Sequence, residues 1–429
     1  MPFYESNLVA GLQWGNEGKS QIVDFLLHSA DVVARFQGCS NDVRTLSSNG
    51  VTYDFSYLPS GFSIPGLKTL ICGGVTLDLE RFVTELEIAR TNGFLKSNLI
   101  VSKACHLILD HHKKLDVLDG RAFSHAQNRT LDDMGLGYCC ADKYRRVGIR
   151  VSDLLDKDTL YKKIERTLHF KNIVFERLHG EKGLDPAQQC EKYWNFGKKL
   201  APYIGDSEAV LRDAFRSNLR ILFEGTDGTM HDVDAGPYPY VLPLSSVSGS
   251  AFLSFGGPQR MPLRVIGVAK AYSVCGGSGP FIAEERGAVA PFIRNRGREF
   301  SKITGQPHRI GWLDLPALKY AINRNGADVL ALTNLGVLTG IDEIKICIGY
   351  RVAGKDYFEY DITPEEMAAA EPLYRIFPGW REEISDRVHF YDLPQQAQQY
   401  VRYIEETMDK PVLCVGVGSN WGETLFNIR

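Results

Sequence analysis

A glycine-rich stretch near the N-terminus carries residue types that bind phosphate. Gly11–Gln21 is Gly-Leu-Gln-Trp-Gly-Asn-Glu-Gly-Lys-Ser-Gln, with a lysine directly after its last glycine. Glycines let backbone N–H groups approach an anion closely. A helix that begins here adds a favourable dipole, and Lys19 adds a full positive charge. The spacing differs from the common GxxxxGK[ST] loop. We therefore predict a phosphate-binding loop, with a purely structural glycine turn as the alternative.

The surrounding sequence predicts the elements that must position this loop. The apolar run Leu8–Gly11 predicts a strand, and the apolar spacing of Ser20–Ser29 predicts a helix. Further strands are predicted at Asp31–Phe36, Leu99–Val101, Arg220–Phe223, Val265–Val268, Val329–Leu332, Glu343–Ile348 and Pro411–Val415, and further helices at Asp78–Asn92 and His106–Leu118. Strands separated by helices indicate an α/β fold with a mostly parallel central sheet.

A single domain over residues 1–429 accounts for this pattern, with a helical elaboration at about 152–218. In a parallel sheet, ligands bind in loops at the carboxyl ends of the strands. Five unusual segments fall at such ends: Gly11–Gln21, Gln37–Thr45, Glu224–Asp234, Thr333–Leu338 and Gly416–Thr424. We expect the ligand site among them.

Charge and composition argue against several classes of partner. The 429 residues carry a net charge of −3 without a block of Lys or Arg, which disfavours nucleic acid and a membrane surface. No apolar run approaches the roughly 18 residues that cross a bilayer. The N-terminus lacks the features of a signal peptide. Nine scattered cysteines without a CxxC pair predict reduced thiols in a cytoplasmic protein.

The string Gln-Trp-Gly-x-Glu-Gly-Lys resembles the start of the adenylosuccinate synthetases, whose signature is GxQWGDEGKGK. Similar segments follow in the family's order: Val32–Gln37, Tyr57–Gly61, Ile149–Leu155, Phe223–Asp234, Lys270–Phe281, Gly311–Asp314 and Val337–Lys345. The resemblance implies the family's fold, a homodimer, and a ligase of purine metabolism. In that reaction GTP phosphorylates the 6-oxygen of inosine monophosphate, Mg²⁺ bridges the phosphates, and aspartate joins carbon 6. Phosphate contacts are implied for Gly15, Glu17, Gly18, Lys19 and Ser20, with Lys19 also near the transferring phosphoryl group.

The residues that carry the family's proton chemistry differ here. The family's catalytic Asp, which is also a Mg²⁺ ligand, falls on Asn16, whose amide can ligate a metal but cannot take up a proton at neutral pH. The catalytic His falls on Arg44, which holds phosphoryl charge but is no acid at pH 7. Val43 replaces a glycine whose backbone helps bind the metal, while Asn41 keeps the family's residue type. Asp42 is a new carboxylate, either a substitute base or metal ligand or a solvated loop acid.

The pocket for the acceptor nucleotide also departs from the family. A phosphate-binding Thr becomes Asp132, whose carboxylate would repel a phosphate. The purine-contacting Gln becomes Asp227, and a second phosphate-contacting Thr becomes Leu242. Arg146 matches the Arg that reaches the neighbouring subunit's site in the family's dimer, although Arg145 competes for that alignment. These changes predict an acceptor other than inosine monophosphate.

The loop that binds aspartate in the family keeps only part of its pattern. Gln306 and His308 stand where arginines would grip ribose and carboxylates, while Thr304 and Arg309 remain. A single Arg can still hold one carboxylate in a bidentate pair. His308 could substitute as a cation below about pH 6.5. A dicarboxylate amine is therefore less secure here than in the family.

The segment that recognises guanine in the family is altered as well. The motif TKxD becomes Thr333–Gly336, with Asn334 at the lysine and Gly336 at the aspartate. A glycine cannot accept hydrogen bonds from the guanine edge, so we expect relaxed base preference, with ATP or GTP as cosubstrate. The last loop carries Gly418 and Trp421, and an indole there could stack on a purine.

Three functional interpretations follow. The first is a ligase of the family's type with an altered acceptor and an open choice of amine. The second is a true adenylosuccinate synthetase with compensated substitutions, and the third is an inactive nucleotide-binding relative. Outside these motifs, His111 and His112 are adjacent in a predicted helix, where side-by-side residues point to different faces, which disfavours a metal site.

Overall fold

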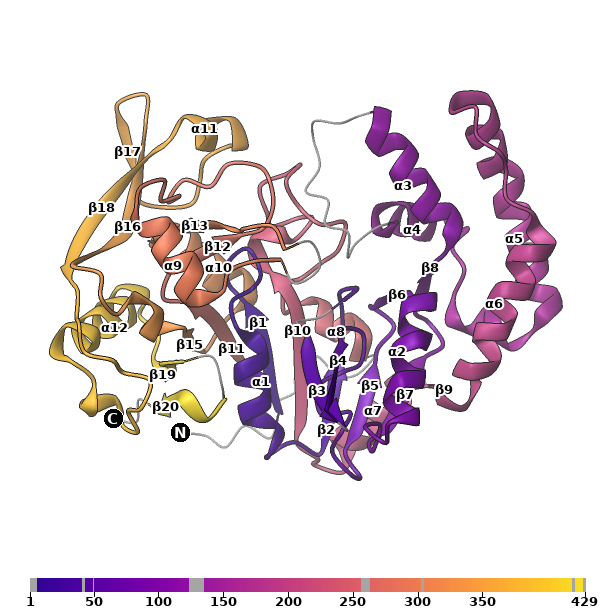
Figure 1. The fold of residues 1–429 in the computed structure, drawn as a ribbon, viewed down its shortest axis with the longest axis horizontal. Coiled ribbons are helices and arrows are strands. Elements are labelled where there is room, and N and C mark those ends of the chain that lie inside the picture. Colours follow the sequence, from indigo (N-terminus) through magenta and orange to yellow (C-terminus); the bar gives the residue numbers. More distant parts are fainter. Residues whose placement is uncertain are drawn as a thin grey trace.

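A ten-stranded sheet forms the centre of the protein in a computed structural model, which describes residues 6–40, 43–48, 50–122, 135–255, 263–301, 305–418 and 421–426 (Figure 1). Its strand order is β20-β19-β15-β11-β1-β10-β2-β5-β7-β9. Every neighbouring pair is parallel except β19 and β20, which are antiparallel. The strands are β1 (Ser6–Gly11), β2 (Val32–Arg35), β5 (Lys68–Ile71), β7 (Asn98–Ser102), β9 (Ile204–Gly205), β10 (Ile221–Gly228), β11 (Leu263–Lys270), β15 (Val329–Thr333), β19 (Val412–Gly416) and β20 (Thr424–Phe426). The predicted α/β fold with a mostly parallel sheet is confirmed.

The central strands are covered on both faces, and their sequences reflect this. Leu8, Val9 and Ala10 of β1 are at most 1% exposed, although successive residues of a strand point to opposite faces. A strand buried on both sides has a continuous apolar run in place of alternation. The apolar run that predicted a strand at Leu8–Gly11 is therefore the pattern of a strand buried on both faces of the sheet.

Helices connect and flank the strands, and several begin and end on residues typical of helix ends. They are α1 (Lys19–Leu27), α2 (Leu79–Thr91), α7 (Ser207–Arg216), α8 (Ser250–Phe255), α9 (Val289–Gly297), α10 (Leu315–Asn325), α11 (Pro364–Ala369) and α12 (Gln395–Met408). Asp78 caps α2 by accepting a hydrogen bond from the backbone N–H of Arg81. Asp314 caps α10 in the same way, and Gly326 ends that helix in the left-handed conformation.

The predicted helical elaboration lies at one end of the molecule. It contains η2 (Val151–Leu155), α5 (Lys157–Ile173), η3 (Val174–Leu178), α6 (Pro186–Leu200) and η4 (Ala201–Tyr203). Figure 1 shows α5 and α6 beside α3 (Asp110–Ala122) and α4 (Leu136–Tyr144), far from β16 and β18 at the opposite end. The elaboration also contains strand β9, which pairs with β7 and forms an edge of the central sheet.

Two local predictions are confirmed only in part. The strand predicted at Glu343–Ile348 is β16 (Glu343–Val352), which lies in a separate sheet with β14 (Leu313–Asp314), β17 (Lys355–Tyr357) and β18 (Glu371–Pro378). Residues His106–Ile108 form strand β8 beside β6 (Thr76–Asp78), and helix α3 starts only after it. Two antiparallel pairs complete the described strands: β3 (Arg44–Ser48) with β4 (Val51–Phe55), and β12 (Ser273–Cys275) with β13 (Arg309–Gly311).

All nine cysteines are free and buried. Among the described helices, none is both long enough and apolar enough to span a bilayer.

Candidate functional site

The glycine-rich loop connects β1 to α1 and leaves the start of that helix open to an anion. Gly15, Asn16 and Gly18 all have positive φ, at 75°, 57° and 80°. Gly18 is the N-cap of α1 and has no side chain to cap the first turn, so backbone N–H groups there keep their capacity to bind phosphate. The exposed Asn16 adopts the left-handed conformation that Asn tolerates better than most residues.

A buried carboxylate braces the loop from within. Glu17 is 0% exposed and accepts hydrogen bonds at 3.0 Å from the backbone N–H groups of both Gln13 and Gly15. Its second oxygen lies 2.5 Å from Nζ of Lys19, which is itself only 3% exposed. The hydroxyl of Thr333, at the end of β15, donates to the backbone carbonyl of Glu17. Glu17 therefore fixes the loop from beneath.

Gln13 is a second brace that the sequence did not reveal. Its side-chain amide donates to the carbonyl oxygens of Lys270 and Tyr272, and its Oε1 accepts from the backbone N–H of Lys270 at 3.0 Å. These bonds join the phosphate loop to the carboxyl end of β11. The glutamine stands inside the glycine-rich string, but its partners lie more than 250 residues away.

Arg44 is held by acidic and hydroxyl groups of the protein itself. Its guanidinium contacts the carboxylate of Asp24 on α1 and the hydroxyl of Ser60, and lies 3.9 Å from Oε1 of Glu224 on β10. Only 14% of the Arg44 side chain is exposed. The role predicted for it, holding a phosphoryl group, remains a prediction.

Three residues of interest lie at or near the end of β10: Asp227 and Leu242, which were predicted, and His231, which was not. Asp227 has φ 58° and is partly buried, with one carboxylate oxygen 3.2 Å from the Thr226 hydroxyl. His231 ends the turn η5 (Thr229–His231), and its Nδ1 lies 3.6 Å from the point where a β-carbon at Gly15 would stand. The backbone carbonyl of His231 accepts a hydrogen bond from the backbone N–H of Leu242, which brings that buried residue beside the turn.

The two adjacent arginines after α4 are now distinguished. Arg145 reaches back to Asp142, with 3.5 Å between the charged atoms. Arg146 is exposed, has φ 64°, and forms no side-chain hydrogen bond or ion pair with the residues the structure describes. Asn41, Asp42, Asp132 and Thr304 lie outside the described residues, as does the side chain of Trp421. Val43 and Ser20 are half-buried, beside Arg44 and in the first turn of α1 respectively.

The residues predicted to hold the amine differ in availability. Both donor edges of Arg309 are used inside the chain: it forms a bidentate pair with Glu284 at 2.7 and 2.8 Å and donates to the carbonyls of Gly277 and Gly279. The expectation of a fork open to a substrate carboxylate therefore does not match this conformation. Gln306 is exposed.

His308 is a neutral group at neutral pH. Its Nδ1 is buried and has no hydrogen-bond partner among the described residues. Burial lowers the pKa of its imidazole, which outweighs the attraction of Glu299. The prediction that His308 becomes a cation below about pH 6.5 is therefore wrong, because a lower pH is needed to charge this ring.

The predicted base-binding segments meet beside the phosphate loop. Asn334 has φ 57° and precedes the turn η6 (Leu335–Leu338), while Gly336 packs on the end of β19. A β-carbon at Gly336 would stand 2.0 Å from the carbonyl oxygen of Val417. Gly418 follows that residue directly, and Thr333 contacts the loop at Gly18. Aspartate therefore cannot occupy position 336 without rearrangement of the backbone.

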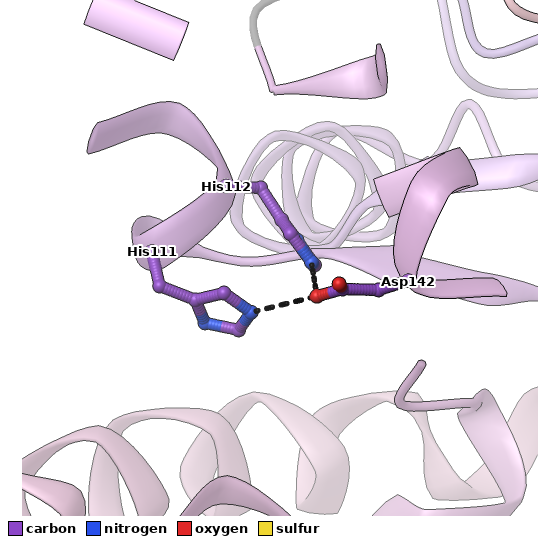
Figure 2. A group of neighbouring side chains, drawn as sticks. All are labelled: His111, His112 and Asp142. Carbon is purple, nitrogen blue, oxygen red and sulfur yellow. Dashed lines mark hydrogen bonds and ion pairs between the residues drawn. The ribbon is translucent and has the colours of Figure 1, made fainter. Parts of the chain in front are cut away.

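A cluster of two histidines and one aspartate in the helical end is the strongest metal candidate among the described residues (Figure 2). His112 Nε2 lies 3.2 Å and His111 Nε2 3.9 Å from one oxygen of Asp142. The two rings converge, with centroids 4.0 Å apart, so the expectation of divergent faces was wrong. Both histidines lie in the first turn of α3, and both rings point toward Asp142 (Figure 2).

The surroundings of this cluster favour a hydrogen-bonded core over a metal site. Nδ1 of His112 accepts from the backbone N–H of Leu109, so Nε2 carries the proton that points at Asp142. Lys171 and Arg145 already contact the other oxygen of Asp142. A cation would have to displace both positive charges and a proton.

Buried histidines in this end predict a pH-dependent stability. Burial lowers the pKa of His106 to about 4, reinforced by Arg150 and Lys143 and opposed by Asp153. The unfolded chain binds this proton below about pH 6.5, so stability falls as pH drops from about 6.5 to 4. His106→Gln should reduce the loss measured at pH 4.5 by up to about 3 kcal/mol, because each of the roughly two pH units below 6.5 contributes ~1.4 kcal/mol. Urea unfolding of both proteins at pH 7.5 and 4.5 measures the difference, and equal losses would contradict it.

Comparisons with known proteins place the chain beside one family over nearly its whole length. The model of the adenylosuccinate synthetase family matches residues 8–425. The adenylosuccinate synthetase of Carboxydothermus hydrogenoformans is 38% identical over 98% of both chains, and that of Caldanaerobacter subterraneus subsp. tengcongensis is 36% identical over 97% of this chain and 98% of its own. Among solved structures, the fully ligated adenylosuccinate synthetase of Plasmodium falciparum matches with a TM-score of 0.89 at 29% identity, covering 98% of this chain and 99% of the other. The succinoaminodeoxyadenylate synthetase of cyanophage S-2L, bound to dGMP and dATP, has a TM-score of 0.61 at 17% identity over 99% and 96% of the chains, and supports the fold alone.

Proposed function

The chain belongs to the adenylosuccinate synthetase family, and on that premise we propose that it is a nucleoside-triphosphate-dependent ligase whose acceptor is not inosine monophosphate. It phosphorylates an oxygen of a purine-like or related acceptor and joins an amine, aspartate or another, at the activated carbon. The observation that carries the proposal is the contrast within one site. The phosphate loop is built and doubly braced, whereas the acceptor corner has gained a carboxylate at Asp227.

The loop supports a triphosphate as the cosubstrate. The open start of α1 and the positive charge of Lys19 suit a phosphate chain. The same lysine also compensates for the negative charge of Glu17 beside it. Members of this family use GTP with Mg²⁺. Asn16 fits such an ion, because its exposed amide makes no hydrogen bond within the described chain and offers an oxygen ligand. The backbone carbonyl of Val43 is the second protein ligand expected. When bound, the ion neutralises charge on the phosphates.

The acceptor and amine regions support altered specificity. Asp227 places an anion where a neutral amide stands in the family, which favours an acceptor with donors or positive charge. Arg309 is paired with Glu284, and Gln306 and His308 supply no permanent cation. An amine with fewer carboxylates than aspartate would lose less in this loop.

A true adenylosuccinate synthetase is the second candidate, and the 36–38% identity to proteins of that name favours it. Purified protein should be incubated with Mg²⁺, GTP or ATP, and pairs of acceptor and amine, and inorganic phosphate release followed. We expect release with an acceptor other than inosine monophosphate. Release with inosine monophosphate and aspartate at rates above every other pair supports the second candidate and contradicts the first. Nucleotide binding without release for any pair indicates an inactive relative.

Base preference is a separate prediction. Gly336 cannot accept hydrogen bonds from guanine, and Val417 closes the space that a side chain would need. We expect kcat/KM for GTP and ATP to agree within about tenfold, since a lost polar contact removes discrimination of several orders of magnitude. Initial rates with each nucleotide measure this. A preference for GTP of roughly a hundredfold or more would contradict it.

A homodimer completes the proposal. Arg145 is used by Asp142, so the exposed Arg146 is the residue free to reach a second copy's site. Sedimentation at several concentrations tests the dimer. Mixing Arg146→Ala protein with a site-inactive variant tests whether one subunit completes the other's site.

A further inference from the structure

Asp227 and His231, near the phosphate loop, are open to a ligand. The other charged groups of the site, Glu17, Lys19 and Arg44, are paired within the protein. Asp227 has one oxygen near Thr226, and its other oxygen makes no hydrogen bond within the described residues. Neither ring nitrogen of the partly buried His231 has a partner in that part of the chain. Partly buried polar groups without protein partners keep hydrogen-bonding capacity that water or a ligand can use.

The fold holds this pair at the phosphate loop by close backbone contact. Between Val9 and Gly11 of β1, the partner residues on β10 advance from Glu224 to Gly228, so a bulge turns Asp227 out of the ladder. Gly228 then passes so close to the loop that a β-carbon there would stand 2.2 Å from the Gln13 carbonyl. The backbone N–H of Met230 donates to that same carbonyl. The imidazole of His231 is thereby fixed against Gly15, directly before Asn16.

Among the described residues, the polar side chains of the loop itself and Arg44 beside it are unsuited to proton transfer. Glu17 is enclosed and bound to two N–H groups and to Lys19. Arg44 cannot exchange a proton at neutral pH, and Asn16 is an amide. A ligase of the proposed kind nevertheless needs a base when the acceptor oxygen attacks the γ-phosphorus.

We propose that His231 is the catalytic base of phosphoryl transfer in this chain, and that Asp227 is the positioning residue that stabilises its protonated form. This rests on the proposed function. In the step, the acceptor's ring N–H bond breaks and His231 takes the proton. The N–H electron pair forms a C=N bond, the carbonyl electrons form the new O–P bond, and the bond from γ-phosphorus to the bridging oxygen breaks. The nucleoside diphosphate leaves with that electron pair.

The charges around the pair suit this role. Burial lowers the pKa of His231, so the ring is neutral and able to accept a proton at pH 7. Asp227 from β10 and Glu17 from the loop favour its protonated form, and Lys19 from α1 opposes it. Burial raises the pKa of Asp227, while His231, Lys19 and Arg35 lower it. The charge of each group therefore favours the charged form of the other.

The first test observes the imidazole directly and needs no acceptor. In ¹⁵N-histidine-labelled protein, the His231 signals are identified by their loss in His231→Gln. We expect them to shift when Mg²⁺ and the β,γ-methylene analogue of GTP or ATP are added. We also expect the pKa of His231 to fall by about one unit in Asp227→Asn, because the favourable carboxylate is gone. Unchanged signals with both analogues would overturn the proposal.

The second test follows positional isotope exchange between the β,γ-bridging oxygen and the non-bridging oxygens of the β-phosphate, with inosine, guanosine and deoxyguanosine monophosphates as acceptors and no amine. We expect His231→Ala to lose about 10²–10⁴-fold in rate and added imidazole to restore part of it. His169→Gln, an exposed histidine on α5, is the control and should retain the wild-type rate. Full exchange in His231→Ala overturns the proposal. If none of these acceptors supports exchange by the wild-type protein, the proposed function fails. The imidazole signals alone then decide whether His231 faces the nucleotide.

Discussion

Replacement of Gly228 by alanine is expected to abolish tight binding of nucleoside triphosphate and to destabilise the protein. An added β-carbon would stand 2.2 Å from the carbonyl oxygen of Gln13, 2.4 Å from the carboxylate of Glu17 and 2.4 Å from the backbone nitrogen of Gly15. Two of these atoms belong to the backbone of the phosphate loop, which cannot yield without moving its N–H groups. We expect a loss of about 3 kcal/mol in the free energy of unfolding. We also expect at least about a hundredfold increase in the Kd for the nucleotide, or ~2.8 kcal/mol.

A matched alanine substitution separates steric conflict from loss of backbone freedom. Gly137 in helix α4 has nothing within 4 Å of its added β-carbon and is exposed. Gly137→Ala should be neutral or stabilising by up to about 1 kcal/mol, because alanine favours the helix. Urea unfolding and calorimetric titration with the Mg²⁺–nucleotide would measure both variants. If Gly228→Ala bound nucleotide as tightly as Gly137→Ala, the loop would not depend on its contact with β10.

The sequence predicted the scaffold of this site more completely than its polar contacts. The buried run of β1 and the glycines after it have local causes, since strand burial and positive φ are imposed on the residues themselves. The pairing of Arg309 with Glu284 joins residues 25 positions apart, and no local pattern reveals it. The sequence thus identified the arginine but not the carboxylate that pairs with it.

His231 was missed for a similar reason. Its only sequence signal is a titratable residue four positions after Asp227, within a segment already assigned to the acceptor pocket. The bulge in β10 and the short turn η5 bring it to Gly15, and both depend on pairing with β1. Strand β16 was misplaced because the alternation of a strand is the same whichever sheet it joins. His111 and His112 converge because Asp142 arrives from another helix.

The buried pair of Glu17 and Lys19 should show strong energetic coupling. Glu17→Gln leaves the ammonium of Lys19, 3% exposed, without its carboxylate, and we expect a loss of about 3–5 kcal/mol in unfolding free energy. Lys19→Met leaves Glu17 with two backbone N–H donors, so we expect a smaller loss. A neutral pair removes both unpaired charges, so the double variant should be more stable than the sum of the single losses predicts, by about 2–3 kcal/mol.

A double-mutant cycle by urea unfolding measures that coupling, with Lys157 and Glu191 as the control pair. Those residues are also 2.5 Å apart, but both side chains are about half exposed, at 47% and 54%. Water screens such a pair, so its coupling should be much smaller than that of the buried pair. Equal coupling in the two cycles would mean that burial adds nothing to the pair in the loop. A large coupling for Glu17 and Lys19, with a small one for the control pair, would indicate that this ion pair holds the phosphate loop in place before any nucleotide arrives. The carboxylate does so because it neutralises the lysine and fixes two N–H groups. A bound triphosphate would then add its charge to a loop that needs little rearrangement, which is the condition for tight binding at a helix N-terminus.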